Sequence, residues 1–448
     1  MDNAASDVIV IGGGPAGVIT ALTALRYYPD KSVTLIKNQE VGIIPCGIPY
    51  MFNSLDSPDD NKMGIGALES NGVTVLTDEV TQINRNNKNI KTTAGKALSY
   101  EKLVLATGSK PVVPPIPGAE SDRVFPIKKD IGFMKSLVEK IKEADSVLIV
   151  GGGFIGVELA DEIAGLGDVD VHLVEMLPDL LANSFDAEFG AMAEERLLQK
   201  QVNVIKNTRV EEFASNGKLT AAKLSNGETI SIDYAIIGIG SSPNTSLAEN
   251  AGLNLFDGSG IWVDEYMRTT DPDIFAVGDC AAKRDFFTRA KTSVMLASTA
   301  TAEARIAGAN LYRLKVVREN KGTIAIYSTY VDGLVLGSAG LTERTATREN
   351  FEVITGRAEG PDKHPGKLPG TNQCKVKLIF SKNSETIMGG QVAGGPAAGE
   401  MINIIGAALQ KRASRTEFET MQMATHPYLT AAPTQYPIVV AAQNASYE

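Results

Sequence analysis

The stretch Val8-Ile-Val-Ile-Gly-Gly-Gly-Pro-Ala-Gly17 is repeated later in the chain as Val147-Leu-Ile-Val-Gly-Gly-Gly-Phe-Ile-Gly156. In both copies an apolar strand runs directly into G-x-G-x-x-G and then into a helical pattern. Glycines at these positions permit a tight turn, a close approach of the backbone to a pyrophosphate, and packing of the helix on the strand. The helix N-terminus then faces the phosphates. Two copies predict two bound dinucleotides and therefore electron transfer between them.

The composition excludes several other classes of function. The 448 residues carry a net charge of −10, which disfavours nucleic acid or an anionic membrane as the main partner. The first strand begins within ten residues of Met1, so we expect no signal peptide, and no apolar run approaches the length of a membrane span. None of the three cysteines forms a C-x-x-C pair, which argues against a disulfide framework and a metal site. We therefore expect a cytoplasmic protein.

The order of patterns predicts an α/β fold followed by a different unit. Strands and helices alternate through residues 1–110, 146–175 and 202–240, which indicates parallel sheets. The Pro-rich segment Lys110–Gly118 cannot continue a sheet or helix and predicts a crossover between domains, with a second boundary near Ser241–Asn244. From about residue 322 alternating strands, a helix and a Pro-punctuated tail predict a separate α+β domain.

In each motif, the residue at the end of the second strand is expected to determine which dinucleotide binds. Glu175 lies about twenty residues past the second glycine motif, where a carboxylate binds the adenosine ribose hydroxyls and repels the extra phosphate of NADP. This favours NADH. In the first copy the position expected to be acidic is Ile36, so the ribose must be held by the backbone or by Glu40. Further downstream, Asp279 follows a short strand and is able to hydrogen-bond the sugar-alcohol chain of a flavin.

The motif order G-G-G-P-A-G, A-T-G, G-G-G-F-I-G, G-I-G-S-S-P-N and F-A-V-G-D resembles the FAD- and pyridine-nucleotide-dependent disulfide oxidoreductase superfamily over essentially the whole chain. The resemblance implies two Rossmann-like dinucleotide-binding domains and a C-terminal α+β dimerisation domain, hence a homodimer. It places a discontinuous FAD-binding domain at 1–115 and 245–322, an NAD-binding domain at 116–244 and the dimerisation domain at 323–448.

The same resemblance implies the residues that contact each cofactor. The helix near Ala297–Ala307 would direct its N-terminus at the flavin ring. The implied FAD residues are Gly12, Gly14, Pro15, Ala16, Gly17, Ala106, Thr107, Gly108, Gly278, Asp279 and Ala297. The implied NADH residues are Gly151, Gly153, Phe154, Ile155, Gly156, Glu158, Glu175 and Gly240, with Phe154 as a lid that NADH displaces from the flavin.

Cys46 identifies the branch of the superfamily. The two-cysteine branch has a second cysteine five residues on, where this chain has Met51. The segment instead resembles the single-cysteine branch of coenzyme A disulfide reductases, NADH oxidases and peroxidases, and NADH-dependent persulfide or polysulfide reductases. Their cysteine precedes a helix, and a helix N-terminus lowers the pKa of a thiol, so we expect Cys46 to be substantially thiolate at neutral pH. Cys280 and Cys374 are interpreted as structural.

The chemistry at Cys46 has several candidate substrates. The peroxide-handling relatives carry a histidine in the first glycine motif where this chain has Pro15, so sulfenic acid chemistry ranks behind reduction of polysulfide, persulfide or coenzyme A disulfide. Gly42 and Pro45 replace the Ser and Asn of coenzyme A disulfide reductases, which leaves coenzyme A binding open. The alternatives are an NADH oxidase that uses oxygen and a reductase of an electron-carrier protein.

The C-terminal tail supplies two more candidates. Ala424–Pro433 resembles a stretch of the two-cysteine branch in which a histidine from the partner subunit exchanges protons with the thiols. His426 matches that histidine, but Ala431 stands near the place of the Glu that orients it. Single-cysteine relatives place a tyrosine in this region, and Tyr428 lies near enough to serve in that role.

Overall fold

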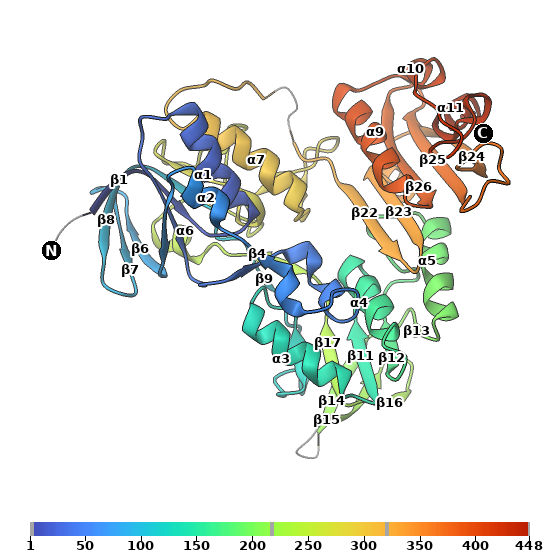
Figure 1. The fold of residues 1–448 in the computed structure, drawn as a ribbon, viewed down its shortest axis with the longest axis horizontal. Coiled ribbons are helices and arrows are strands. Elements are labelled where there is room, and N and C mark those ends of the chain that lie inside the picture. Colours follow the sequence, from blue (N-terminus) through green and yellow to red (C-terminus); the bar gives the residue numbers. More distant parts are fainter. Residues whose placement is uncertain (1–3, 216–218, 319–321, 447–448) are drawn as a thin grey trace.

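The computed structural model describes residues 4–215, 219–318 and 322–446, which form three units (Figure 1). The first unit is built on a seven-stranded sheet of order β5-β2-β1-β8-β7-β6, with β19 also paired to β8. Its strands are β1 Ala4–Ile11, β2 Val33–Lys37, β5 Thr74–Thr77, β6 Val80–Asn84, β7 Asn89–Thr92, β8 Ala97–Leu105 and β19 Ile274–Ala276. All neighbouring strands are parallel except β6 with β7 and β7 with β8.

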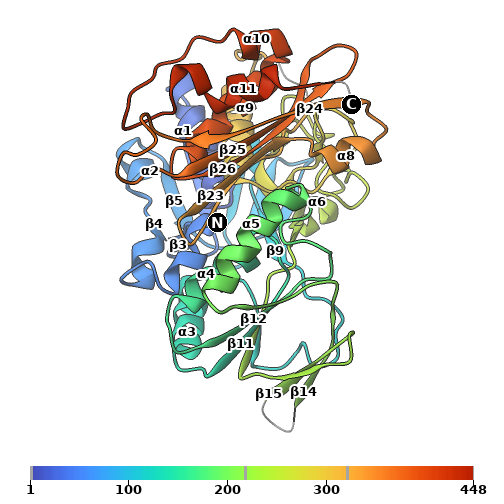
Figure 2. The same ribbon diagram turned by 90° about the vertical axis from the view of Figure 1, so that its right-hand side faces the viewer.

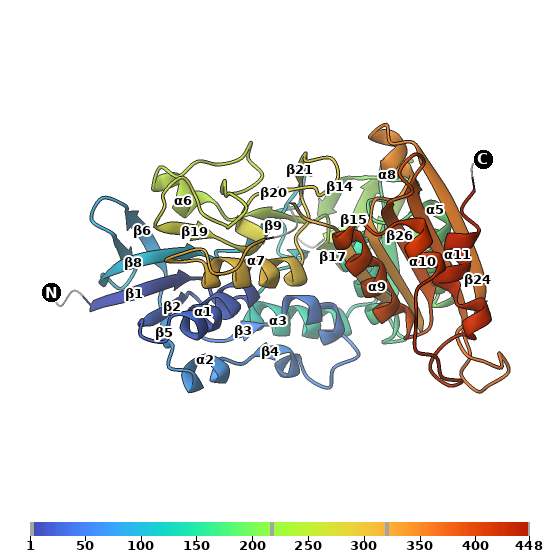
Figure 3. The ribbon, with the colours of Figure 1, turned by 90° about the horizontal axis from the view of Figure 1, so that it is seen from above.

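Two helices from opposite ends of this unit's sequence lie side by side on one face of the sheet (Figure 3). They are α1 (Pro15–Tyr27), which follows the first glycine motif, and α7 (Ala297–Ala309). A Cβ atom on Gly308 would lie 2.8 Å from Cβ of Thr23, so the two helices pack closely only because a glycine stands there. The smaller elements are β3 Gly42–Ile43, β4 Lys62–Met63, α2 Gly66–Ser70, α6 Ser246–Asn250, β20 Lys283–Arg284 and β21 Lys291–Thr292, with 3₁₀ turns η1 Pro45–Gly47, η2 Pro49–Met51, η3 Pro58–Asn61 and η4 Gly278–Cys280.

The second unit repeats the architecture with an entirely parallel five-stranded sheet of order β10-β17-β11-β12-β13. Its strands are β10 Val124–Pro126, β11 Ser146–Val150, β12 Asp170–Val174, β13 Asn203–Ile205 and β17 Tyr234–Ile237. The helices are α3 Ile131–Lys142, α4 Phe154–Ala164 and α5 Ala187–Gln199, and a small antiparallel sheet consists of β14 Val210–Ser215, β15 Leu219–Leu224 and β16 Thr229–Ser231.

The two crossovers between these units pair with each other. The prediction that Lys110–Gly118 cannot continue a sheet is wrong at its first residues, because β9 (Ser109–Pro111) forms an antiparallel pair with β18 (Ser241–Pro243). Proline is tolerated in such an edge pairing because few ladder bonds are needed there. Asn244 reinforces the junction: its backbone N–H donates to the Gly108 carbonyl at 2.9 Å and its side-chain amide donates to the Thr107 carbonyl at 3.0 Å.

The third unit is an antiparallel five-stranded sheet of order β22-β23-β26-β25-β24 covered by helices. Its strands are β22 Ile326–Val331, β23 Leu334–Gly340, β24 Val353–Pro361, β25 Gln373–Ser381 and β26 Ile387–Gly394. Its helical elements are α8 Glu343–Arg348, α9 Ala398–Lys411, α10 Arg415–Glu419, η5 Pro433–Gln435 and α11 Pro437–Gln443. Glycines let α9 lie close to the sheet, since a Cβ atom on Gly337 would lie 2.7 Å from Cβ of Ile402. The α/β fold class with a C-terminal α+β unit is therefore confirmed.

No helix among the described residues combines the length and the apolar character needed to cross a membrane.

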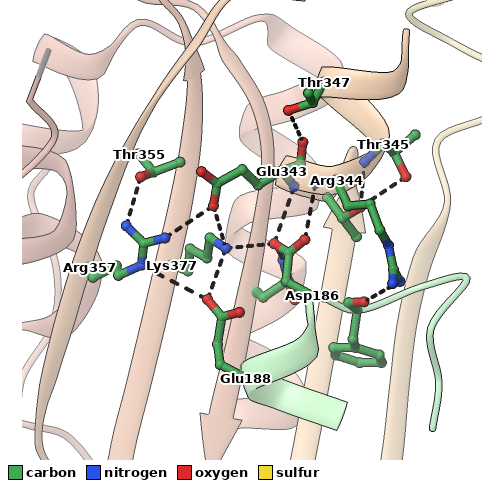
Figure 4. Close-up of polar contacts among 12 residues, drawn as sticks. Asp186, Glu188, Glu343, Arg344, Thr345, Thr347, Thr355, Arg357 and Lys377 are labelled. Carbon is green, nitrogen blue, oxygen red and sulfur yellow. Dashed lines mark hydrogen bonds and ion pairs between the residues drawn. The ribbon is translucent and has the colours of Figure 1, made fainter. Parts of the chain in front are cut away.

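A buried lysine joins the second unit to the third (Figure 4). Helix α5 lies between the third unit's sheet and the second unit's sheet (Figures 1 and 2). The Lys377 side chain, 2% exposed, extends from β25 to three carboxylates, namely Asp186 at 2.7 Å, Glu188 at 2.9 Å and Glu343 at 2.8 Å. Gln391 completes the cluster: its Oε1 accepts the N–H of Asp186 at 2.8 Å and its Nε2 donates to the Asp186 carboxylate at 2.6 Å.

Replacing Lys377 by methionine is expected to lower the free energy of unfolding by about 3–5 kcal/mol at pH 7, because three carboxylates lose their common cation. Burial opposes ionisation of Asp186 and Glu188, but Lys377 together with hydrogen bonds from Gln391 and from backbone N–H groups outweighs it and lowers the pKa of both carboxyl groups. This stabilisation is therefore present above the ordinary carboxyl pKa and is lost as the pH falls through the lowered values. Urea denaturation from pH 7 to pH 3 measures both effects.

Lys375, two residues earlier on β25, supplies the matched control. Its ion pair joins side chains that are 26% and 66% exposed (Lys375 and Glu359), so Lys375→Met should cost no more than about 1 kcal/mol. Equal losses in the two variants would contradict a special role for Lys377.

Candidate active site

The first and last glycines of each motif are required by the protein's own packing. Gly12 and Gly151 have φ of 120° and 108°, which L side chains rarely adopt. A Cβ atom on Gly17 would lie 1.9 Å from the carbonyl oxygen of Gly12, and one on Gly156 would lie 1.7 Å from that of Gly151. Both helices are thereby held against the turn that precedes them.

The middle glycines face open space instead. A Cβ atom on Gly14 or Gly153 would meet nothing within 4 Å, and the same holds for Gly108 and Gly240 in the turns that flank the two motifs. Gly14 and Gly153 are also the N-cap residues of α1 and α4, and neither helix has a side-chain cap. The first N–H groups of each helix thus point into a cradle with room for a phosphate.

The other residues implied for FAD lie around the first cradle. Pro15 and Ala16 form the first turn of α1, and a Cβ atom on Gly278 would lie 2.9 Å from Cβ of Ala16, so the turn that carries Asp279 packs on that helix. Ala106, Thr107 and Gly108 follow β8, and Ala297 is the first residue of α7. In the second unit, Ile155, which is implied for NADH, lies in the first turn of α4.

The prediction that Ile36 stands at the ribose position is wrong by one residue. Ile36 pairs with Ile11 in the sheet just as Val174 pairs with Val150, so the residue that corresponds to Glu175 is Lys37. Ile36 is 1% exposed and belongs to the core, because successive strand residues point to opposite faces. Lys37 lies beside the glycine turn, and its Nζ donates to the Glu40 carbonyl at 2.6 Å.

Glu175 is fixed in the second cradle by two backbone N–H groups. Its carboxylate accepts hydrogen bonds from Gly152 at 2.6 Å and from Leu177 at 2.7 Å. The side chain is 8% exposed and keeps lone pairs free for further donors.

Cys46 lies on the short 3₁₀ turn η1, and the helix expected after it is present only as the short 3₁₀ turn η2. The successive turns η1 and η2 begin at Pro45 and Pro49. Asn61, which the sequence analysis missed, holds this segment: its side-chain amide donates to the Ile44 carbonyl at 3.0 Å, and a Cβ atom on Gly47 would lie 2.0 Å from its Oδ1. Cys46 is exposed, whereas Met51 is fully buried.

The groups of the protein itself do not give Cys46 the low pKa that the sequence predicts. The surrounding protein desolvates the sulfur of this exposed residue, and with the negative charge of Glu158 it raises the pKa of the thiol. Asp279 acts in the same direction, and Lys129 acts against it. The other two cysteines are buried, as expected, and burial raises the pKa of Cys280 and of Cys374.

The two strongest electrostatic neighbours of Cys46 come from the second unit. Glu158 lies one turn into α4 and accepts a hydrogen bond from the Thr329 hydroxyl of β22 at 2.7 Å. Burial raises the pKa of Glu158 to about 7. Lys129 precedes α3, and its Nζ lies 3.1 Å from the Asp279 carboxylate. A cavity of about 340 Å³ lies beside this region, lined by Tyr50, Ser328, Thr329, Tyr330, Val335, Pro396 and Gly399.

Phe154 lies against the third unit. Its ring stacks on that of Tyr327, with 4.8 Å between centroids, and meets the Phe185 ring edge-on at 6.1 Å. Its role as a lid stays a prediction.

His426 and Tyr428 belong to the loop between α10 and η5. Both are exposed, and the His426 Nδ1 accepts the N–H of Tyr428 at 3.3 Å within the loop. The hydroxyl of Thr430 accepts the N–H of His426 at 3.0 Å. Helices α10 and α11 flank this loop at the outer end of the third unit, away from the paired strands β3 and β4 that enclose the Cys46 segment (Figures 1 and 3). One protomer therefore does not bring these residues and the thiol together.

Two glycine-lined nucleotide cradles on successive α/β units, with an exposed thiol between them, define a dinucleotide-dependent oxidoreductase. The chain belongs to the pyridine nucleotide-disulphide oxidoreductase family, whose model matches residues 6–304. The dimerisation domain of that family matches residues 326–436. Members of this family use FAD and NADH, and the resemblance found in the sequence is confirmed.

Individual relatives carry two different activities in their names. An NADH oxidase of Methanocaldococcus jannaschii is 29% identical over 98% of both chains. An NAD(P)H coenzyme A polysulfide/persulfide reductase of Pyrococcus horikoshii is 28% identical over 88% of both chains. The structure of an NAD-dependent persulfide reductase from A. fulgidus superimposes with a TM-score of 0.90 at 29% identity, covering 98% of this chain and 82% of that one.

Proposed function

We propose that this chain is a homodimeric FAD enzyme that uses NADH to reduce a sulfur–sulfur bond through Cys46. The observation that carries the proposal is one exposed thiol on the turn η1, beside a buried Met51 where a second redox cysteine would stand. The preferred substrates are polysulfide or persulfide, with coenzyme A disulfide as a further candidate.

We assign FAD to the first unit, residues 1–115 and 245–322, and NADH to the second, residues 116–244. The open space over Gly14 and Gly108 and over Gly153 and Gly240 supports a nucleotide in each cradle. Bound FAD supplies the two-electron link between NADH and sulfur. The N-terminus of α7 at Ala297 would stabilise the negative charge of a reduced flavin.

The chain's own chemistry centres on the Cys46 sulfur. The thiol loses its proton, and the thiolate attacks one sulfur of the substrate. A Cys46–sulfur bond forms as the substrate S–S bond breaks, and the second sulfur leaves as a thiolate or hydrosulfide. Two electrons from NADH then cleave the Cys46–sulfur bond, which frees the remaining product and restores the thiolate. Glu158, with its pKa of about 7, is suited to exchange the protons that this cycle consumes.

The dimer would complete this site. The tail exposes Tyr428 and Leu429, with 55% and 69% of each side chain accessible, and carries His426. We propose that the tail of one protomer covers the Cys46 turn of the other, where Ile44 is 44% exposed. The match of residues 326–436 to the family's dimerisation domain supports this arrangement.

A second candidate is an NADH oxidase, because the relative from Methanocaldococcus jannaschii bears that name. Reduced flavin reacts with oxygen without a cysteine, so this activity does not depend on Cys46.

To identify the acceptor, purified enzyme is mixed with excess NADH in separate assays. One set contains polysulfide or coenzyme A disulfide under nitrogen, and the other contains oxygen alone. Sulfur reduction predicts fast anaerobic NADH consumption with one sulfur compound and slow consumption with oxygen. The opposite ranking would replace the proposal by the oxidase. If both are slow, a protein acceptor becomes the next candidate and the sulfur proposal is lost.

Changing Glu175 to glutamine should reduce the preference for NADH over NADPH by about tenfold. The amide keeps the size of the side chain and one of its two backbone hydrogen bonds, and it removes the negative charge that repels the extra phosphate of NADPH. The ratio of kcat/KM for the two nucleotides measures the effect, and the FAD content should stay unchanged. An unchanged ratio would show that Glu175 does not face the nucleotide.

A further inference from the structure

Lys37 stands in the first cradle at the place that Glu175 occupies in the second. In each cradle the first glycine of the motif donates its N–H, at 2.8 Å, to the carbonyl of the residue just before this position. A Cβ atom on the second glycine of the motif would lie 2.8 Å from Cβ of Lys37 in one cradle and 3.0 Å from Cβ of Glu175 in the other. The two side chains therefore leave equivalent backbone positions beside equivalent turns, but one is an ammonium and the other a carboxylate.

The first cradle offers hydrogen-bond donors where the second offers an acceptor. In the second cradle the Glu175 carboxylate accepts the N–H groups of Gly152 and Leu177. The corresponding N–H groups of the first cradle belong to Gly13 and Gln39, and neither has an acceptor among the residues that the structure describes. The neighbouring ammonium has no lone pair to offer them. A ligand bound at this position therefore needs acceptor atoms.

Lys37 is also buried without a carboxylate partner. The buried Lys377 is paired with three carboxylates, and the buried Lys283 lies 3.5 Å from the carboxylate of Glu303. Lys37 is 7% exposed, and within the described part of the chain it forms no ion pair. The Glu40 carbonyl accepts one of its N–H donors at 2.6 Å. Because a buried ammonium without a counter-charge is costly, its remaining donors indicate a ligand that is anionic or rich in oxygen acceptors.

We propose that Lys37 makes the adenosine end of the first cradle a donor site, which holds the ribose through its hydroxyl oxygens and accommodates an adenosine nucleotide phosphorylated on that ribose. The second cradle has the opposite polarity, because a carboxylate at this position accepts from the ribose hydroxyls and repels such a phosphate. This assignment rests on the proposed function in that FAD occupies the first cradle. It gives the ribose of FAD a ligand in the absence of an acidic residue.

Lys37→Met should raise the dissociation constant of FAD about tenfold, because methionine keeps the length of the side chain and removes its donors. The release of FAD from the holoenzyme on dilution, followed by the fluorescence of free flavin, measures the change. The melting temperature of the FAD-free chain should stay the same or rise, since an uncompensated buried charge is lost. A lower melting temperature with an unchanged FAD constant would show a purely structural lysine and overturn the proposal.

Lys102→Met is the matched control within the same sheet. Lys102 lies on β8 opposite Val8, well before the glycine turn, and its ammonium is paired with the Asp273 carboxylate at 2.5 Å. Its loss should leave the dissociation constant of FAD unchanged. An equal loss of FAD affinity in the Lys102 and Lys37 variants would contradict a ligand role for Lys37.

The polarity is tested with two competitors that differ by one phosphate, adenosine 5′-monophosphate and adenosine 2′,5′-bisphosphate. Each is added while FAD rebinds to the FAD-free, full-length chain, so that the inhibition of rebinding reports occupancy of the first cradle. The bisphosphate should compete at least about tenfold more strongly in the wild-type chain, and about as strongly as the monophosphate in the Lys37→Met variant. Lys37→Glu, which copies the second cradle, should reverse the preference.

Equal competition by the two nucleotides in the wild-type chain, or a preference that survives in the Lys37→Met variant, overturns the proposal. If the chain takes up no FAD at all, the proposed function fails. Calorimetric titration of the two competitors into the wild-type and Lys37→Met chains then still decides the polarity of the cradle, so the two failures are separate results.

Discussion

A Cys46→Ser variant should retain bound FAD and its reduction by NADH, but lose at least about a thousandfold in turnover of the sulfur substrate. The serine hydroxyl has nearly the size of the thiol but cannot form or release a bond to sulfur at neutral pH. The exposed position of Cys46 means that the exchange leaves the core intact. Anaerobic stopped-flow measurements separate the two half-reactions: flavin bleaching by NADH reports the first, and reoxidation by polysulfide reports the second.

Cys374→Ala provides the control for cysteine removal as such. Cys374 is 2% exposed and lies on β25 in the core of the third unit, so its loss should affect stability and leave turnover unchanged. Unimpaired sulfur reduction by the Cys46→Ser enzyme would remove the basis of the proposed function.

Gly156→Val is expected to weaken NADH binding by about 100-fold while FAD stays bound. The new side chain would begin 1.7 Å from the Gly151 carbonyl oxygen, so the second glycine turn must open, at a cost of about 3 kcal/mol. Gly17→Val places the same clash in the first turn, at 1.9 Å from the Gly12 carbonyl oxygen, and should release FAD instead. NADH titration and the flavin absorbance of the purified protein measure the two losses.

Gly153→Ala separates ligand contact from folding. A Cβ atom there meets nothing within 4 Å in the protein, so the melting temperature should not change, whereas a bound pyrophosphate would be displaced. A Gly156→Val protein that loses FAD and keeps its NADH affinity would reverse the assignment of the two cradles.

The glycine turns were predictable because every requirement is local. The strand, the turn and the helix follow one another within ten residues, and the clashes over Gly17 and Gly156 come from the same motif. The ribose position was not local. It depends on the pairing of Ile11 with Ile36, and a count along the sequence missed Lys37 by one residue. In a strand, a shift of one residue moves a side chain from the core face to the opposite face, which here faces the cradle.

The Cys46 segment was mispredicted for a different reason. Pro45 and Pro49 each suit the first position of a helix, but a second proline four residues on removes an N–H donor and interrupts a continuous helix, so two 3₁₀ turns result. The neighbours of Cys46 could not be predicted either. Lys129 and Glu158 come from sequence-distant elements of another unit. Lys377 is typical of an exposed strand lysine until β25 packs against the start of α5.

The pairing of β8 with β19 also has a consequence for synthesis of the chain. The sheet that begins with β1 lacks its last parallel strand until Ile274–Ala276 has been translated, and α1 lacks its companion until Ala297–Ala309 follows. At 5–20 residues per second, the ribosome takes roughly 15–50 s to cover that interval. The continuous second unit is complete earlier and is free to fold first. The N-terminal β-α segment meanwhile exposes an apolar helix face and an open strand edge, so its final packing depends on residues made much later.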